Sequence, residues 1–109
     1  MDEKTQKLFT AKANILKALA HPTRLFIVDT LNRNNYCVQD LTKMVGADIS
    51  TISKHLNILK NAGVIQDQKE GTKVFYRLAF PCVLDSMTCI ENILRSNAKN
   101  QQEIIECCK

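Results

Sequence analysis

Apolar residues recur every three or four positions through the first half of the chain, which predicts a series of short helices. The first is expected over residues 3–19, and Pro22 then suits the first turn of a second helix over residues 23–31. A polar loop over residues 32–36 and a short helix over residues 37–45 follow. The second helix should be the most buried because it carries the densest apolar run, Leu25, Phe26, Ile27, Val28 and Leu31.

A helix predicted over residues 48–62 divides into two faces at 3.6 residues per turn. The apolar face, expected to dock on the core, contains Ile49, Ile52, Leu56 and Leu59. The opposite face carries hydroxyl, amide and ammonium groups without a carboxylate: Ser50, Ser53, Lys54, Asn57, Lys60 and Asn61. Such a face can hydrogen-bond base edges and neutralise phosphates. Asp48 is the expected N-cap and Gly63 the expected stop. This segment alone leaves open an ordinary amphipathic surface helix.

The apolar period changes from 3.6 to 2 after residue 63. Strands are expected over residues 64–68 and 73–78, joined by a glycine-containing turn over residues 69–72. A short helix, a glycine turn and a polar-faced helix, followed by a basic hairpin, form a helix-turn-helix with a wing over residues 64–78. Phosphate contacts are expected from Lys69, Lys73 and Arg77. The alternative is a solvent-facing hairpin with lysines that discourage edge pairing.

Residues 81–105 are expected to form a long closing helix with more apolar surface than one small domain needs. Its apolar positions are Val83, Leu84, Met87, Ile90, Ile93 and Leu94. We interpret this helix as a dimer interface, because a two-fold partner would present a second recognition helix to pseudo-palindromic double-stranded DNA. The predicted fold is mainly α with a small β-hairpin (α+β), one winged helix-turn-helix domain over residues 1–109 that forms a homodimer through its terminal helices.

Composition and charge agree with this picture without demanding it. The chain has 109 residues, 45% of them hydrophobic, and a net charge of +4, so the placement of the basic residues matters more than their surplus. No apolar run of about 18 residues is present, and no membrane partner is expected. The charged first residues lack an apolar signal region, which makes a cytoplasmic location the expectation.

Five cysteines are unusual for so short a chain: Cys37, Cys82, Cys89, Cys107 and Cys108. Their odd number does not suit a closed disulfide framework, and no CxxC pair indicates a zinc ribbon. They are either buried apolar residues or a thiol sensor. Cys82 and Cys89 would lie about 10 Å apart along a helix axis, too far to chelate one ion. Adjacent Cys107 and Cys108 can converge on one ion, joined by Cys37 or Cys89, and Cys82 should matter least.

Four segments in this order resemble the ArsR/SmtB family of winged-helix metal-sensing repressors: LKALAHPTRLFIV (16–28), YCVQDL (36–41), ISTISKHLNILKNAGVI (49–65) and EGTKVFYRL (70–78). The resemblance implies a dimer with terminal helices at its interface, whose operator affinity falls when an inducer binds. It also implies that Ser50, Thr51, Ser53, Lys54 and His55 contact DNA or support such contacts. A packing or capping role for His55 is an equal expectation, because it lies toward the core edge of the helix.

The sensing residues depart from the family pattern. Members with a thiolate site on the third helix usually carry CxC, whereas this chain keeps only Cys37 and has Gln39 in the second place. The closing helix contains no histidine, which disfavours zinc, cobalt and nickel. Sulfur ligands suit arsenite, antimonite, cadmium, lead or cuprous ions. The expected function is a DNA-binding repressor without a constitutive cofactor, released from its operator by a thiolate-bound soft metal or metalloid, with arsenite the first choice.

Two other functions stay open from the sequence. The same fold could sense oxidants by forming a disulfide or persulfide between cysteines. A cysteine-nucleophile enzyme is the more distant alternative. It is disfavoured because the two histidines lie at a helix break and in the recognition helix, and because no phosphate cradle or oxyanion signature is visible.

Overall fold

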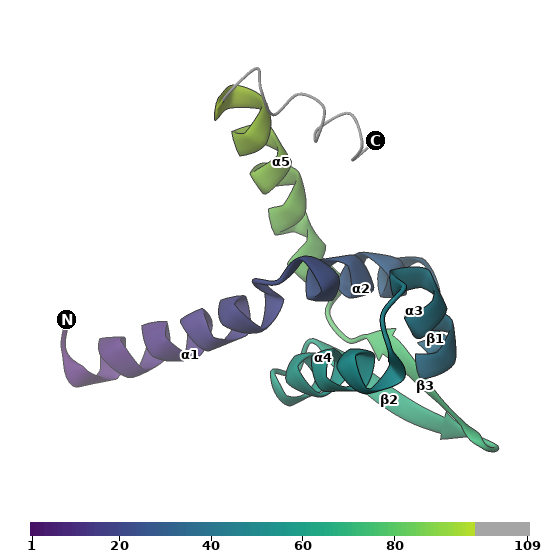
Figure 1. Cartoon of the computed structure of the whole chain (residues 1–109). Coiled ribbons are helices and arrows are strands. Elements are labelled where there is room, and N and C mark those ends of the chain that lie inside the picture. Colours follow the sequence, from purple (N-terminus) through teal and green to yellow (C-terminus); the bar gives the residue numbers. More distant parts are fainter. Residues whose placement is uncertain (98–109) are drawn as a thin grey trace.

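The structure, a computed structural model, describes residues 1–97. Helices α2, α3 and α4 and a small sheet form the body, and α1 and α5 project from it in different directions (Figure 1). No helix in residues 1–97 is both long enough and apolar enough to cross a membrane. The elements in chain order are α1 (Glu3–Leu19), α2 (Pro22–Arg33), β1 (Tyr36–Cys37), α3 (Val38–Val45), α4 (Ile49–Asn61), β2 (Ile65–Glu70), β3 (Lys73–Leu78), η1 (Pro81–Leu84) and α5 (Asp85–Asn97).

The ends of the central helices follow the expected signals. Pro22 occupies the first turn of α2, and the His21 side chain caps that helix by accepting a hydrogen bond from the Thr23 backbone N–H. Helix α3 ends at Gly46, whose left-handed φ of 80° favours glycine. The Asp48 side chain caps α4, as predicted. These signals are local, which is why the order of the helices could be predicted from the sequence.

The sheet has one strand more than the predicted hairpin. Tyr36 and Cys37, expected to end a loop and begin a helix, form β1 and pair antiparallel with Tyr76 and Phe75 of β3. The strand order is therefore β1-β3-β2. A strand of two residues is too short to produce an alternating pattern, so its pairing depends on contacts with residues distant in the sequence.

The wing turn is tighter than the sequence predicted. Lys69 and Glu70 belong to β2 rather than to the turn, and Glu70 pairs with Lys73. The turn consists of Gly71 and Thr72, and Gly71 has a φ of 63° that a two-residue hairpin turn requires. The two wing lysines consequently lie on paired strands next to the turn.

The hydrophobic core joins α2, α3, α4 and the base of the wing. The predicted apolar face of α4 is confirmed for Ile52, Leu56 and Leu59, which are fully buried. The prediction is wrong for Ile49, the first residue of the helix, whose side chain is 50% exposed. Phe26 was also expected inside but is 47% exposed, where it lines a shallow hollow beside α3. The buried core residues are Leu19, Ile27, Val28, Leu31, Leu41, Ile52, Leu56, Leu59, Val64, Ile65 and Leu78.

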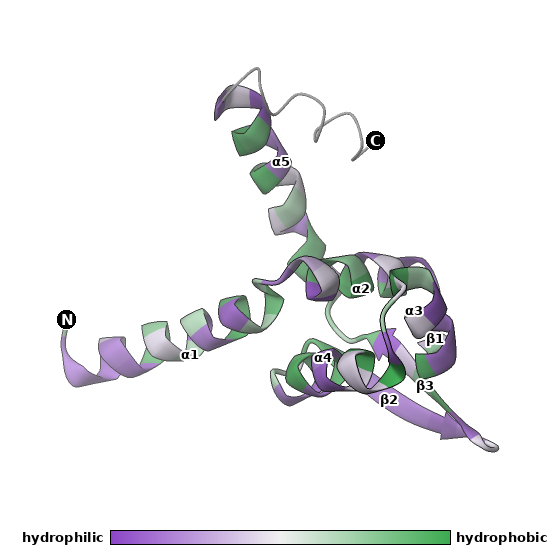
Figure 2. Ribbon diagram, viewed as in Figure 1, coloured by the Kyte–Doolittle hydropathy of each residue, from purple (hydrophilic) through white to green (hydrophobic). Residues whose placement is uncertain are grey.

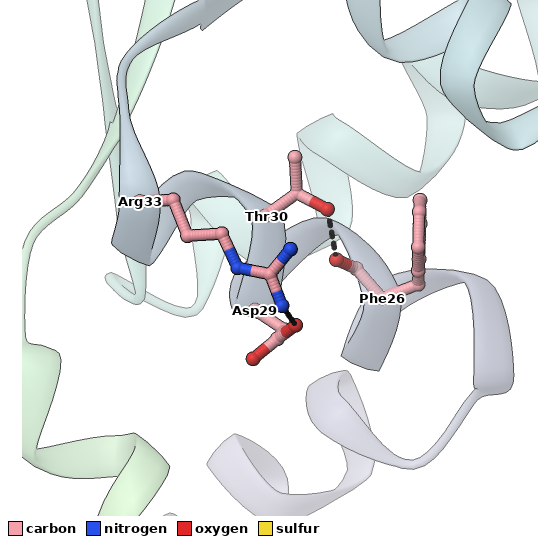
Figure 3. A network of polar contacts seen from close by, with 4 residues as sticks. All are labelled: Phe26, Asp29, Thr30 and Arg33. Atoms are coloured by element: carbon pink, nitrogen blue, oxygen red, sulfur yellow. Dashed lines mark hydrogen bonds and ion pairs between the residues drawn. The ribbon is translucent and has the colours of Figure 1, made fainter. Parts of the chain in front are cut away.

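Two polar contacts of side chains lie within helix α2, as Figure 3 shows. The hydroxyl of buried Thr30 donates a hydrogen bond to the Phe26 carbonyl oxygen at 2.8 Å. On the exposed side, Arg33 forms an ion pair with Asp29 at 3.0 Å, one turn earlier. Within residues 1–97, every buried side-chain nitrogen or oxygen has a hydrogen-bond partner. Among the described residues, the core therefore contains no buried polar side-chain atom without a hydrogen-bond partner.

The closing helix differs from the continuous helix predicted over residues 81–105. Its first turn is the 3-10 helix η1, and the α-helix proper begins at Asp85. The part of the prediction beyond Asn97 lies outside the described residues. None of the residues of α5 is buried, and Ile90 and Ile93 are about half exposed. Figure 2 shows hydrophobic residues on both projecting helices.

Candidate DNA-binding surface

Helices α3 and α4 form a helix-turn-helix with a firmly capped second helix. The Asp48 carboxylate accepts hydrogen bonds from the Thr51 backbone N–H at 2.8 Å and from the Ser50 hydroxyl at 3.2 Å. Hydrogen bonding by Thr51 is the main cause that holds the pKa of Asp48 below its usual value. The only carboxylate at the start of this surface is thus engaged in capping, and the first turn of α4 is fixed.

The predicted polar face of α4 is open to solvent. Ser50, Thr51, Lys54 and Asn57 are exposed, while Ser53 is half-buried. In the part of the chain that the structure describes, Lys54 forms no ion pair. Because the apolar face is fixed in the core, these side chains project from a rigid helix. Their arrangement suits contacts with base edges and phosphates.

The wing carries two exposed lysines beside its turn. Lys69 lies on β2 and Lys73 on β3, where Lys73 is directly paired with Glu70. Farther from the turn, Arg77 donates a hydrogen bond to the Gln66 side chain on the neighbouring strand. Arg77 is therefore held along the sheet, and Lys69 and Lys73 are the cations nearest the wing tip.

Lys60 has a partner that the sequence did not reveal. Its ammonium group lies 2.9 Å from the Asp67 carboxylate on β2. This hydrogen bond raises the pKa of Lys60 and lowers the pKa of Asp67. Burial of nearby Tyr76 raises the pKa of its phenol, with a smaller contribution from Asp67. Lys60, predicted as a DNA contact, thus also joins the recognition helix to the wing.

His55 turns toward the body and contacts Arg24, a residue to which the sequence analysis gave no role. Arg24 donates a hydrogen bond from Nη1 to His55 Nδ1 at 3.1 Å, and from Nε to the Ala18 carbonyl oxygen at 2.5 Å. The ring of His21 lies 4.5 Å from that of His55. Burial is the main cause that lowers the pKa of His55, followed by electrostatic repulsion between a proton on its ring and the His21 and Arg24 side chains. The available signal was an arginine directly before the apolar run of α2.

The cysteines that the structure describes lie in different surroundings. Cys37 is 1% exposed, and its thiol donates a hydrogen bond to Asp40 at 3.2 Å. Cys82 on η1 and Cys89 on α5 are exposed. Cys107 and Cys108 lie outside the described residues. Within residues 1–97, no three Cys, His, Asp or Glu side chains are grouped so that they could hold a metal ion.

Comparison with known proteins assigns the chain to a family. The model of the bacterial regulatory proteins of the arsR family matches residues 21–67. Transcriptional repressor SdpR of Bacillus subtilis is 35% identical over 81 residues, which is 74% of this chain and 90% of that protein.

Two solved structures have the same fold. A homodimeric winged helix-turn-helix DNA-binding domain from Mycobacterium bovis has a TM-score of 0.75 and 26% identity, covering 90% of this chain and 95% of that one. Reduced HlyU from Vibrio cholerae has a TM-score of 0.71 and 27% identity, covering 84% and 97% respectively. With the helix-turn-helix, its polar recognition face and the basic wing, these matches establish that the chain belongs to the ArsR/SmtB family of winged helix-turn-helix transcriptional regulators.

Proposed function

We propose that the chain is a homodimeric repressor that binds a pseudo-palindromic operator and leaves it when a thiol-directed effector binds. The observation that carries the DNA-binding part is the division of α4. Ile52, Leu56 and Leu59 fix the helix in the core, while Lys54 and Asn57 project from the opposite side. With α4 in the major groove, Lys69 and Lys73 on the wing would contact adjacent phosphates.

The exposed apolar surface of the terminal helices supports the homodimer. Leu16 on α1 is 62% exposed, and α5 contains no buried residue. A helix of 13 residues without tertiary packing is marginal in water. A second copy that covers α1 and α5 would supply this packing and place two recognition helices on one DNA duplex. The homodimeric relative from Mycobacterium bovis is consistent with this assembly.

Arsenite is our first choice of effector because the chain has five cysteines, and thiolate sulfur is a soft ligand that favours soft metals and metalloids. The described residues of one chain do not by themselves fit a three-ligand site. We therefore assign the ion to Cys107 and Cys108, with Cys89 as the ligand from the body of the chain. Cys37 is the least suitable ligand, since its thiol is enclosed and bonded to Asp40. Each As–S bond forms as a thiol displaces one hydroxide of As(OH)3, and the thiol proton leaves with that hydroxide as water.

Oxidation of cysteine is the second candidate signal. Cys82 and Cys89 are exposed, and exposure is one of the conditions that make a thiol susceptible to oxidants. The relative HlyU is known in a form described as reduced. In this alternative, peroxide oxidises the thiols of Cys89 and a second cysteine to a disulfide and is itself reduced to water, and this disulfide takes the place of the bound ion.

A mobility-shift titration tests the proposal. The full chain is bound to its own promoter DNA and challenged separately with arsenite, cadmium, zinc and peroxide. We expect release by arsenite that is lost in Cys89→Ser, Cys107→Ser and Cys108→Ser, with operator binding of the effector-free variants retained. Release by peroxide alone would favour the redox signal. Release by arsenite in all three variants would contradict the thiolate assignment.

A further inference from the structure

Two histidines and an arginine meet where α1, α2 and α4 join. Arg24 of α2 donates hydrogen bonds to the carbonyl oxygens of Ala18 and Lys17, at 2.5 and 3.5 Å, and to Nδ1 of His55 on α4 at 3.1 Å. A single guanidinium group therefore joins the end of α1 to the recognition helix. His21, at the junction between α1 and α2, lies against the His55 ring at 45°.

These contacts determine where the protons of both rings lie. A guanidinium group has only hydrogen-bond donors, so Nδ1 of His55 must accept and carries no proton. The backbone N–H of Thr23 likewise donates to Nδ1 of His21 at 3.1 Å, so that nitrogen is also unprotonated. In this arrangement the His55 imidazole is neutral, with its hydrogen on Nε2. Protonation of His55 would set an N–H donor and a positive charge directly against Arg24.

The charged surroundings offer the protonated ring no compensation. Arg24 and His21 are the charged or titratable groups that act on His55, and both lower its pKa. The carboxylates on two other elements packed against α4 have partners of their own. Asp40 of α3 accepts a hydrogen bond from the Cys37 thiol, and Asp67 of β2 forms an ion pair with Lys60. Lys43 of α3 and Lys54 of α4 itself carry the same charge as an imidazolium. No carboxylate among the described residues is placed to stabilise a charged His55.

We infer that Arg24 is a positioning residue for the recognition helix, and that operator binding requires His55 to be uncharged so that Arg24 can hold α4 against α1. This inference rests on the proposed function and extends it to a regulation by pH. Acid would open the cluster, release α4 from the end of α1 and weaken binding to DNA. Helix α1 belongs to the proposed dimer interface, which sets the distance between the two recognition helices. Because Arg24 joins α1 to α4, it would also fix how each recognition helix is oriented relative to that interface.

The sign of the pH effect separates this role from direct DNA contact. A histidine that contacted phosphate as a cation would bind the operator more tightly in acid, because DNA binding would be coupled to proton uptake. A neutral, positioning His55 has the opposite effect, and operator affinity falls in acid. A loss of affinity in acid that disappears when His55 is replaced by a residue that does not titrate is attributable to His55.

The experiment measures operator affinity of the full chain by fluorescence anisotropy between about pH 5 and 8 at constant ionic strength. For the wild type we expect a constant affinity above about pH 7 and a loss of about tenfold in acid, the size of one charge-assisted hydrogen bond. An affinity that is flat or rises in acid would overturn the inference. Absence of operator binding at every pH would instead contradict the proposed function.

Two variants at His55 provide the matched control. His55→Asn keeps an acceptor close to the position of Nδ1 but does not titrate, whereas His55→Ala removes the acceptor. We expect His55→Ala to bind weakly at every pH, and His55→Asn to recover most of that loss at pH about 7.5 with a smaller loss in acid. Equal affinities and equal pH profiles for the two variants would contradict the role of Arg24. Circular dichroism confirms that both variants are folded.

Discussion

Lys60 on the recognition helix and Asp67 on the wing form an ion pair, with 2.9 Å between Nζ and Oδ2. The pair joins the two elements that would approach DNA and neutralises one of the cations there. A carboxylate beside a phosphate-binding surface is unfavourable to DNA, so Asp67 reduces the electrostatic attraction that Lys60 would otherwise provide. We therefore expect operator binding to depend on the lysines that have no such partner among residues 1–97, Lys54 above all.

Asp67→Asn should strengthen operator binding. The substitution frees the Lys60 ammonium for phosphate, so the dependence of log affinity on log salt should become steeper by about one contact. The measurement is operator affinity at four or more salt concentrations. Weaker binding with an unchanged salt dependence would show instead that the ion pair positions the wing. Lys60→Ala in the Asp67→Asn background should remove the gain.

Lys54→Ala should weaken binding nearly equally for operator and for unrelated DNA. Lys54 is exposed and forms no ion pair among residues 1–97, so we expect it to contact phosphate. The salt dependence should decrease by about one. The matched control is Lys4→Ala, which removes an exposed lysine in the first turn of α1. If the variant has the affinity and salt dependence of the wild type, Lys54 does not contact DNA.

Ile90→Glu should convert the dimer to monomers and weaken operator binding. Ile90 is 47% exposed on α5, and a carboxylate there would be desolvated if a second copy covered it. Sedimentation at several protein concentrations measures the change. Thr88→Glu introduces the same charge on the same helix, about 200° around the helix axis from Ile90. The protein with this substitution should stay dimeric. Monomeric wild-type protein at concentrations that saturate the operator would contradict the prediction.

Cys37→Ala should affect stability rather than sensing. The thiol is enclosed and donates a hydrogen bond to Asp40, and its removal should lower the free energy of unfolding by about 1 kcal/mol. Urea unfolding measures this loss. Arsenite should still release the variant from DNA. A variant as stable as the wild type but no longer released would make Cys37 a ligand of the ion.

The sequence predicted the features that local patterns encode. The two faces of α4, the Asp48 cap and the basic hairpin all depend on residues within a few positions of each other. The strand β1 could not be predicted, because two residues produce no period and their partner is β3. The contact between Arg24 and His55 joins residues 31 apart in the sequence. It depends on how α2 and α4 pack, which no local pattern encodes.

In the function proposed above, α4 and the wing bind DNA as parts of a symmetric dimer. The most direct measurement is a footprint of the full chain on its own promoter, combined with the stoichiometry of the complex. We predict two chains on one pseudo-palindromic site, with half-sites about one helical turn apart and an affinity that falls steeply with salt. One chain per site, or binding that does not distinguish the promoter from unrelated DNA, would contradict binding as a symmetric dimer.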